Sequence, residues 1–205
     1  MSFTPPARSR PLCLRCQRPV SACVCHWIRP TDNQLSVLIL QHPLERHHAK
    51  NSAGLLALSL ARCRREVGEV FDPALLREWI GPLRSAALLY PSTGLGPETD
   101  ARPPQIRKLV IIDATWRKSL RMLAGNPFLQ SLPRLTLQDT PPPRYRIRQA
   151  RQAHQLSTLE ACCLALAELE DRPERYQPLL AAFDGFVAEQ ARWMAGLPPS
   201  EPSVS

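Results

Sequence analysis

The chain has 205 residues and a formal net charge of +8, with 26 basic residues against 18 acidic ones. This length can bury one substantial core, so the simplest organisation is one domain with appended tails. No run of 18 apolar residues occurs and the N-terminus lacks the apolar segment of a signal peptide, so we expect a soluble cytoplasmic protein without a membrane partner. The positive charge favours an anionic partner, most often nucleic acid.

Four closely spaced cysteines follow a short N-terminal tail. They form a CxxC and a CxC pair: Cys13, Cys16, Cys23 and Cys25. In a reducing compartment, thiolates at this density are more often metal ligands than disulfides, and four of them complete a closed tetrahedral zinc site. We predict a knuckle with structural Zn²⁺ over residues 12–30, with His26 as a substitute for one ligand. Chance clustering or redox-active thiols are the alternative.

Three short apolar runs are typical of strands buried on both faces of a parallel sheet. They cover residues 35–41, 86–90 and 109–112, and a further strand is expected at 134–137. Each of the three runs ends in polar or glycine-bearing residues, and in open α/β sheets such strand ends border the ligand crevice. We therefore predict one α/β domain with a mostly parallel sheet, flanking helices and a crevice at these ends.

Helices are expected between and after these strands. Apolar patterning predicts a helix over 52–63, closed by three arginines. Residues 66–85 are expected to hold a short strand and an irregular helix around 72–79. Ser157 and Glu160 form a capping-box pattern at the start of a later helix, and an amphipathic stripe predicts the last helix over 174–194. The other cysteines fall in helical patterns and are expected to be ordinary buried residues: Cys63, Cys162 and Cys163. The tails at 1–11 and 197–205 are rich in proline and serine, and we expect them to be disordered.

A polar cluster with the letters DATW follows the strand at 109–112. It begins at Asp113 and leads into an amphipathic helix, in which Leu120 recurs with Trp116 at helical spacing. At such a junction Asp113 and Thr115 lie where a ligand would bind. The alternative is that they only cap the helix by accepting its first backbone N–H groups, with Trp116 in the core.

Basic side chains indicate where nucleic acid would bind. Residues 140–159 contain no acid, and arginines alternate there so that an extended segment would carry them on one face. This pattern predicts a phosphate track, joined by the basic residues directly after Trp116, although a charged edge-strand face would look the same. The predicted RNA-binding residues are Arg117, Lys118, Arg144, Arg146, Arg148 and Arg151.

These motifs together resemble those of a known family. DATW at 113–116 is similar to the DxTW signature of the DTW-domain proteins, the tRNA-uridine aminocarboxypropyltransferases, in their bacterial form. The cysteine pairs, QHPLE at 41–45, LYPS at 89–92 and STLEA at 157–161 match in the same order. Each motif is weak alone, but five in order are specific, and together they cover roughly residues 13–190.

The resemblance implies a fold and a reaction. It implies a SPOUT-like catalytic domain at 31–196 with a knotted C-terminal crossover, which ordinary topology rules disfavour. It also implies S-adenosylmethionine as donor substrate and tRNA as partner. The 3-amino-3-carboxypropyl group would pass to N3 of a uridine, with release of methylthioadenosine. Bacterial members resemble the enzymes that modify the variable-loop uridine at tRNA position 47.

The reaction needs a base for the uridine N3 proton and alignment with the donor. Asp113 is the expected base, and Thr115 and Trp116 complete the predicted catalytic group. Trp116 is also a candidate for stacking on the positively charged sulfonium of the donor.

The donor's amino-acid arm requires opposite charges nearby. Glu45 or Glu160 would take its ammonium, and His42, Arg117 or a helix N-terminus its carboxylate. The other residues expected to line the donor pocket are Leu89, Tyr90, Pro91, Ser92, Thr93, Ile112, Ser157 and Thr158.

Two other functions compete with this interpretation. A SPOUT-type RNA methyltransferase would use the same pocket with the donor turned so that its methyl group faces the nucleophile. A non-catalytic zinc-bearing RNA-binding module would need Asp113 and Thr115 only as helix caps. The sequence leaves the oligomeric state open.

Overall fold

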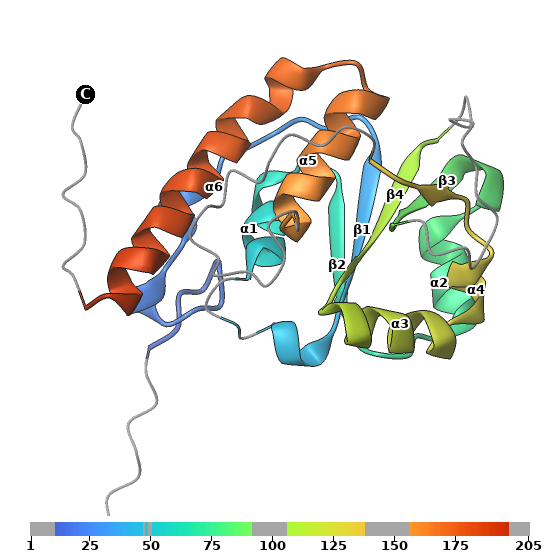
Figure 1. Cartoon of the computed structure of the whole chain (residues 1–205), viewed down its shortest axis with the longest axis horizontal. Coiled ribbons are helices and arrows are strands. Elements are labelled where there is room, and N and C mark those ends of the chain that lie inside the picture. Colours follow the sequence, from blue (N-terminus) through green and yellow to red (C-terminus); the bar gives the residue numbers. More distant parts are fainter. Residues whose placement is uncertain (1–10, 47, 49–50, 92–105, 138–155, 197–205) are drawn as a thin grey trace, which may run out of the picture.

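Five parallel strands form the centre of the molecule. The computed structural model describes residues 11–46, 48, 51–91, 106–137 and 156–196, and its sheet has the order β2-β1-β4-β3-β5 (Figure 1). Neighbouring strands all pair in parallel, which confirms the predicted α/β class and parallel sheet. The strands are β1 Ser36–Gln41, β2 Cys63–Val67, β3 Ala86–Leu89, β4 Lys108–Asp113 and β5 Arg134–Leu135.

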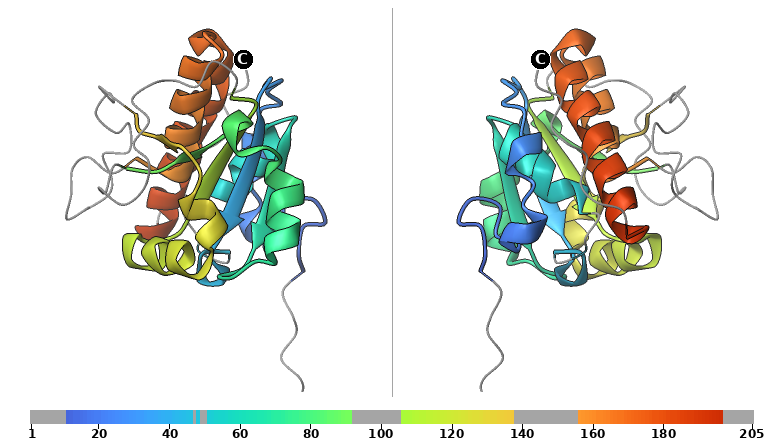
Figure 2. Two further views of the ribbon diagram at one scale, coloured as in Figure 1. Left: turned by 90° about the vertical axis from the view of Figure 1, so that its right-hand side faces the viewer. Right: turned by 90° about the vertical axis from the view of Figure 1, so that its left-hand side faces the viewer.

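Helices cover both faces of this sheet (Figure 1). One face packs against α1 Ser52–Ser59, α5 Thr158–Leu169 and α6 Pro173–Met194. The other packs against α2 Pro73–Ile80, α3 Trp116–Gly125 and α4 Pro127–Gln130. Helices α5 and α6 lie side by side, as Figure 2 shows from two further directions. Short 3-10 turns are η1 Val20–Ala22, η2 Cys25–Trp27, η3 Pro43–Glu45 and η4 Leu83–Ser85.

Strand β1 shows why the apolar runs are nearly continuous. Val37 and Ile39 belong to the core on the α5 side, whereas Leu38 and Leu40 belong to the core on the α2 side. A strand with helices on both faces buries every side chain, so alternation with polar residues disappears.

The chain leaves the neighbouring strands β1 and β4 in opposite directions. After β1 it passes through α1 to β2, and after β4 it passes through α3 and α4 to β5 on the other side. The two connections also cover opposite faces of the sheet. Open parallel sheets hold ligands at such a switch point, outside the carboxyl ends of the strands. A ligand site is therefore expected at the carboxyl ends of β1 and β4.

The prediction of one helix over 52–63 is wrong in its last third. Helix α1 ends at Ser59, because Leu60 has extended backbone, and Cys63–Val67 pairs with β1 as strand β2. Arg64 and Arg65 therefore lie on a strand and do not close a helix. Because β2 is at the sheet edge, its side chains are half-buried or exposed and give no apolar run. Cys63 was wrongly expected in a helix, whereas Cys162 and Cys163 are buried in α5 as predicted.

Most other predicted elements are confirmed. Helix α2 matches the prediction at 72–79, α6 matches 174–194, and β5 forms two residues of the strand expected at 134–137. The predicted apolar stripe of α3 is wrong in part, because Trp116 and Leu120 are 48% and 37% exposed while Met122 and Leu123 reach the core.

Several predictions lie outside the described residues. They include both tails apart from Pro11, and residues 138–155, which connect β5 to α5. The knotted crossover of a SPOUT-like fold consequently stays a prediction. Among the described helices, none combines the length and apolar character that a membrane crossing requires.

The cysteine-bearing segment packs onto the domain. Val24 and Ile28 belong to the core that contains α5 and α6. Trp27 lies against α6, where its Nε1 donates to Glu189 Oε2 at 2.5 Å. A Cβ atom placed on Gly185 would lie 2.2 Å from the Trp27 ring. The segment can therefore pack this closely only because that helical position has no side chain.

We expect Gly185→Ala to destabilise the protein by about 2 kcal/mol, since the added methyl group must displace the Trp27 ring. This figure is net of the gain of about 1 kcal/mol that alanine brings to a helix. Thermal denaturation of the single variant and of a variant in the Trp27→Ala background provides the measurement. In that background the same substitution is expected to be neutral or stabilising, and equal destabilisation in both would contradict the contact.

Candidate functional site

The carboxyl ends of β1 and β4 lie side by side. Gln41 and Asp113 are register partners at these ends, and the next amide, that of His42, donates to the Asp113 carbonyl at 3.0 Å. Strand β3 lies on the other side of β4, with Leu89 opposite Ile111. Two of the predicted motif segments, QHPLE and DATW, therefore meet at the carboxyl ends of the strands.

Asp113 connects three elements through its side chain. Its Oδ2 accepts from Gln41 Nε2 at 2.7 Å, and its Oδ1 accepts from Thr158 Oγ1 at 2.5 Å. The residue at the N-cap of α3 is Thr115, whose side chain makes no capping hydrogen bond. The capping alternative is therefore wrong for this junction. Asp113 instead presents a half-buried carboxylate, oriented through both oxygens, at the switch point of the sheet.

Gln41 is a site residue whose role could not be predicted from the sequence. It is fully buried, and beyond its bond to Asp113 its Oε1 has no hydrogen-bond partner among the described residues. An uncharged polar residue at the end of an apolar run was the available signal. Its contact with Asp113 depends on strand register, which the sequence alone did not specify.

The start of α5 brings Thr158 to the site. The predicted capping box is confirmed: Ser157 Oγ accepts from the Glu160 amide at 3.2 Å, and Glu160 Oε2 accepts from the Ser157 amide at 2.9 Å. Glu160 is only 3% exposed. The box fixes the first turn of the helix, so that Thr158 reaches Asp113 across 45 residues of sequence.

An aromatic pair forms the next part of this edge. The Trp116 ring stacks on Tyr90, with centroids 5.5 Å apart and planes 20° from parallel. The Tyr90 hydroxyl is 2.8 Å from Ser119 Oγ, which also donates to the Trp116 carbonyl. The guanidinium carbon of Arg134 lies 5.1 Å from the centre of the Tyr90 ring. Trp116 is half exposed and is not in the core, so its surface is available to a ligand.

Burial raises the pKa of Tyr90, and the hydrogen bond with Ser119 together with the charge of Arg134 opposes that rise. The phenol therefore stays protonated at neutral pH and able to donate or accept a hydrogen bond.

His42 and Glu45 lie beside the site in structural pairs. The His42 ring is nearly buried: its Nδ1 accepts from the Leu44 amide at 3.2 Å, and its Nε2 is 3.0 Å from Glu69 Oε1. Glu45 Oε1 is 2.8 Å from Lys118 Nζ, which joins the η3 turn to α3. Both residues are thus close to the strand ends, and both already have partners.

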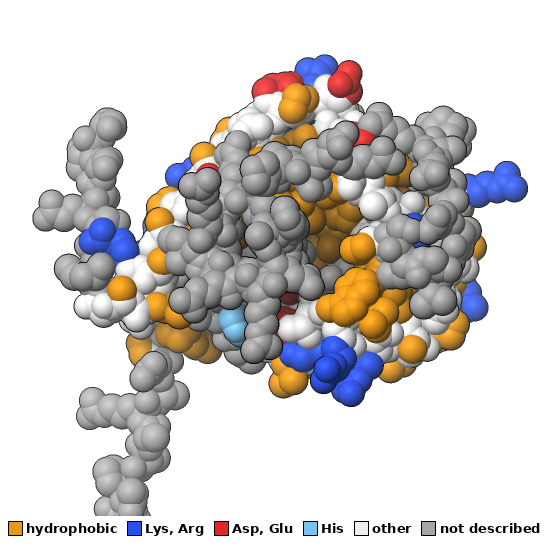
Figure 3. All heavy atoms as spheres, in the orientation of Figure 1, with side chains coloured by type: hydrophobic (Ala, Val, Ile, Leu, Met, Phe, Trp, Pro, Cys, Tyr) orange, Lys and Arg blue, Asp and Glu red, His pale blue; other side chains and the backbone are white. Residues whose placement is uncertain are grey.

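The remaining predicted residues divide into three groups. Leu89 and Ile112 are half-buried at strand ends and Pro91 is exposed. Arg117 is exposed on α3, and Figure 3 shows basic side chains next to hydrophobic ones where Figure 1 places this helix. Outside the described residues lie Ser92, Thr93, Arg144, Arg146, Arg148 and Arg151.

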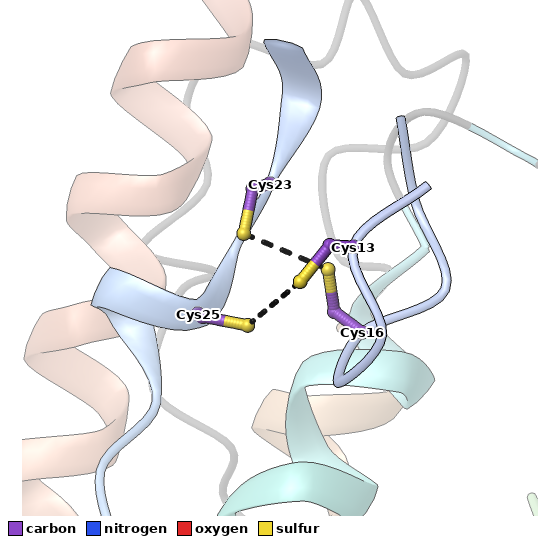
Figure 4. A group of neighbouring side chains, drawn as sticks. All are labelled: Cys13, Cys16, Cys23 and Cys25. Atoms are coloured by element: carbon purple, nitrogen blue, oxygen red, sulfur yellow. Dashed lines mark hydrogen bonds between the residues drawn. The ribbon is translucent and has the colours of Figure 1, made fainter. Parts of the chain in front are cut away.

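A second cluster contains the four N-terminal cysteines (Figure 4). All four Sγ atoms lie within 4.8 Å of one another, with the Cys13–Cys25 and Cys16–Cys23 pairs at 3.7 and 3.8 Å. Hydrogen bonds from the backbone of Cys16 and Arg15 lower the pKa of the Cys13 thiol to about 6. The four sulfur atoms are therefore arranged like a metal-ligand set, as the spacing predicted.

Comparison with known proteins places the chain in a family. The family model for the DTW domain matches residues 10–191. The tRNA-uridine aminocarboxypropyltransferase 2 of Drosophila melanogaster is 34% identical over 190 residues, covering 88% of this chain and 74% of that protein. The Macaca fascicularis protein of the same name is 29% identical over 196 residues, covering 90% and 65%.

A plant relative, tRNA-uridine aminocarboxypropyltransferase A of Arabidopsis thaliana, is 30% identical over 142 residues, covering 57% of this chain and 52% of that protein. The chain thus spans between about half and three quarters of the length of these three relatives. No solved structure shows significant similarity to it. Because the family model covers most of the chain, the protein belongs to the DTW-domain family.

Proposed function

We propose that this protein is a tRNA-uridine aminocarboxypropyltransferase that uses S-adenosylmethionine as donor. The observation that carries the proposal is the Asp113 carboxylate, held by Gln41 and Thr158 at the switch point of a parallel sheet. The names of the relatives specify both the transferred group and the tRNA uridine. The family match extends over almost all of the described residues, including those at the site.

Asp113 acts as the base in this proposal. Its carboxylate takes the proton from uridine N3, and N3 forms a bond to the donor carbon next to the sulfonium. The bond between that carbon and sulfur breaks, and its electron pair stays on sulfur, so methylthioadenosine leaves without needing a proton. A correctly placed base and good alignment are therefore the main requirements for catalysis.

Gln41 and Thr158 position the carboxylate for this task. A carboxylate oxygen can accept two hydrogen bonds, and each donor uses one position on a different oxygen. One position per oxygen remains for the substrate. The two donors also come from different elements, β1 and α5, which restricts rotation of the carboxyl group.

The aromatic pair supplies a surface for the donor or for the uracil ring of the substrate. Trp116 presents its half-exposed ring three residues after Asp113, with Tyr90 behind it. An aromatic face attracts a sulfonium cation by about 1 kcal/mol or more when water is excluded. Leu89, Pro91 and Ile112 extend this surface, and Ser92 and Thr93 are assigned to the same pocket.

The charged arm of the donor has two sets of candidate partners. Glu45 is the better candidate for its ammonium, since Glu160 is nearly buried and holds the capping box. The N-terminus of α3 is the better candidate for its carboxylate, since His42 is nearly buried and Arg117 is assigned to the tRNA. Thr115, at the start of α3, is assigned to contact the same arm.

The cysteine cluster is assigned a structural zinc ion. A Zn–S bond of about 2.3 Å places the thiolates of a regular tetrahedron about 3.8 Å apart. The Cys13–Cys25 and Cys16–Cys23 pairs match this separation at 3.7 and 3.8 Å, and all four Sγ atoms lie within 4.8 Å of one another. Four protein ligands leave no open position, so the ion would stabilise the segment at 12–30 and take no part in the chemistry.

Several finer assignments belong to the same proposal. The domain at 31–196 is SPOUT-like, the protein is cytoplasmic, and the modified uridine is the one at tRNA position 47. Arg117 and Lys118 contact the tRNA backbone, together with the arginines assigned between 144 and 151.

Donor labelled separately in its methyl and carboxyl carbons tests the transfer. With purified protein and tRNA, we expect the carboxyl label to enter tRNA and the methyl label to leave as methylthioadenosine. Methyl label in tRNA would indicate the methyltransferase instead. Binding of tRNA without transfer of either label would indicate that the protein is a non-catalytic RNA-binding module.

A further inference from the structure

A cavity lies at the opposite end of the sheet from Asp113. It has a volume of about 430 Å³ and is lined by residues at the starts of β1 and β4 and along the edge strand β2, including Ser36, Arg64 and Lys108. Strand β1 runs from Ser36 in this cavity to Gln41 beside Asp113. At about 3.3 Å per residue the two places are about 17 Å apart. The cavity therefore cannot hold the nucleotide that reacts at Asp113.

Positive charge dominates the lining. Arg62, Arg64 and Lys108 contribute three cations, against the single carboxylate of Glu78. Arg62 is exposed, and its Nη1 donates to the backbone carbonyl of Gln34, a neutral partner. Burial, and then the charge of Arg64, lower the pKa of Lys108. The lining thus carries positive charge that the acids of the described residues do not fully balance.

Trp79 organises two of these cations. The guanidinium carbon of Arg64 lies 4.2 Å from the centre of its ring, and Lys108 donates to its backbone carbonyl near the end of α2. Arg64 also pairs with Glu66 at 2.7 Å. These contacts hold the cationic groups in place before any ligand arrives. The indole Nε1 is buried with no hydrogen-bond partner among the described residues, so this wall also contains an unsatisfied donor.

The combination fits a nucleotide. Arginine and lysine bind phosphate, a guanidinium plane held over an indole can stack a base, and Glu78 can accept from a ribose hydroxyl or a base amino group. The volume is in the range of small-ligand sites. If the cations served only to pack around Trp79, Arg62 would not be needed in the same lining.

We infer that this cavity binds one nucleotide, through its phosphate and base, at a place distinct from the Asp113 site. The inference that the nucleotide belongs to the tRNA rests on the proposed function, since a bound tRNA extends far beyond its reacting uridine. A free mononucleotide has the same chemistry and is the other source.

The test compares two double variants that remove the same charge. Arg62→Gln with Arg64→Gln alters the cavity, and Arg84→Gln with Arg172→Gln is the matched control at exposed positions outside it. Melting curves verify folding. Binding of full-length tRNA is measured over a range of salt concentrations. Calorimetric titration with cytidine monophosphate, which contains neither the donor's base nor the accepting base, tests the free nucleotide.

If the bound nucleotide belongs to the tRNA, we expect the cavity variant to bind tRNA about tenfold more weakly. The slope of log binding constant against log salt concentration should fall in magnitude by about 1 to 2, and the control should change little. Loss of cytidine monophosphate binding with unchanged tRNA binding would identify a free nucleotide. Equal behaviour of the two variants toward both ligands would overturn the inference.

Transfer by the wild-type protein, measured on the same preparation, separates this result from the proposed function. Cavity-dependent binding without any transfer would refute the transferase and leave the cavity assignment standing. Transfer with no difference in binding between the two variants would support the transferase and refute the cavity assignment.

Discussion

Asp113→Asn is expected to lower the rate of aminocarboxypropyl transfer about a thousandfold, since a positioned general base contributes roughly that factor. The substitution keeps the size of the side chain and the acceptor for Thr158. Gln41 can turn its amide over to accept from the new amide group. Donor affinity should therefore change little. The measurement is single-turnover transfer, with donor binding measured separately by calorimetry.

Asp32→Asn is the matched control, because this exposed carboxylate lies outside the site. It should leave both the rate and donor binding unchanged. Full activity of Asp113→Asn would refute the base assignment. A large loss of donor affinity with an unchanged transfer rate at saturating donor would show that Asp113 binds the amino-acid arm instead.

Cys16→Ser is expected to abolish zinc binding and to lower the melting temperature by about 10 °C. A structural zinc site contributes several kcal/mol to folding, and 1 kcal/mol shifts the midpoint of a chain this size by about 2–4 °C. The effect should spread beyond the cysteines, since Val24 and Ile28 belong to the core that includes α6. Elemental analysis and thermal denaturation provide the two measurements.

Cys63→Ser is the control for this substitution. Burial raises the pKa of the Cys63 thiol to about 12, and the residue lies on β2 outside the four-cysteine cluster. Its replacement should leave the metal content unchanged. A wild-type protein purified without metal, with the same melting temperature before and after chelation, would contradict the zinc assignment.

The sequence predicted those parts of the fold that local patterns determine. The apolar runs at β1, β3 and β4 identified strands buried on both faces, and the capping box identified the start of α5. Strand β2 was placed too late in the chain, because an edge strand needs no apolar run and its charged residues looked like the end of a helix. Trp116 was assigned by spacing to an apolar stripe, although the ring lies on Tyr90 at the surface.

The site could be predicted only in part. Asp113 and Thr158 belong to recognised motifs, but their hydrogen bond joins residues far apart in sequence and follows from the packing of α5. Gln41 reaches Asp113 because β1 and β4 are neighbours in register, and strand order is a property of the whole chain. The pairing of Glu45 with Lys118 and of His42 with Glu69 likewise arises only when the elements meet.

The most direct test of the proposed function is mass spectrometry of tRNA nucleosides from cells with and without the gene. We expect aminocarboxypropyluridine to disappear with the gene and to return with the wild-type protein but not with Asp113→Asn. An unchanged amount of this nucleoside in the deletion strain, or full restoration by the variant, would contradict the account.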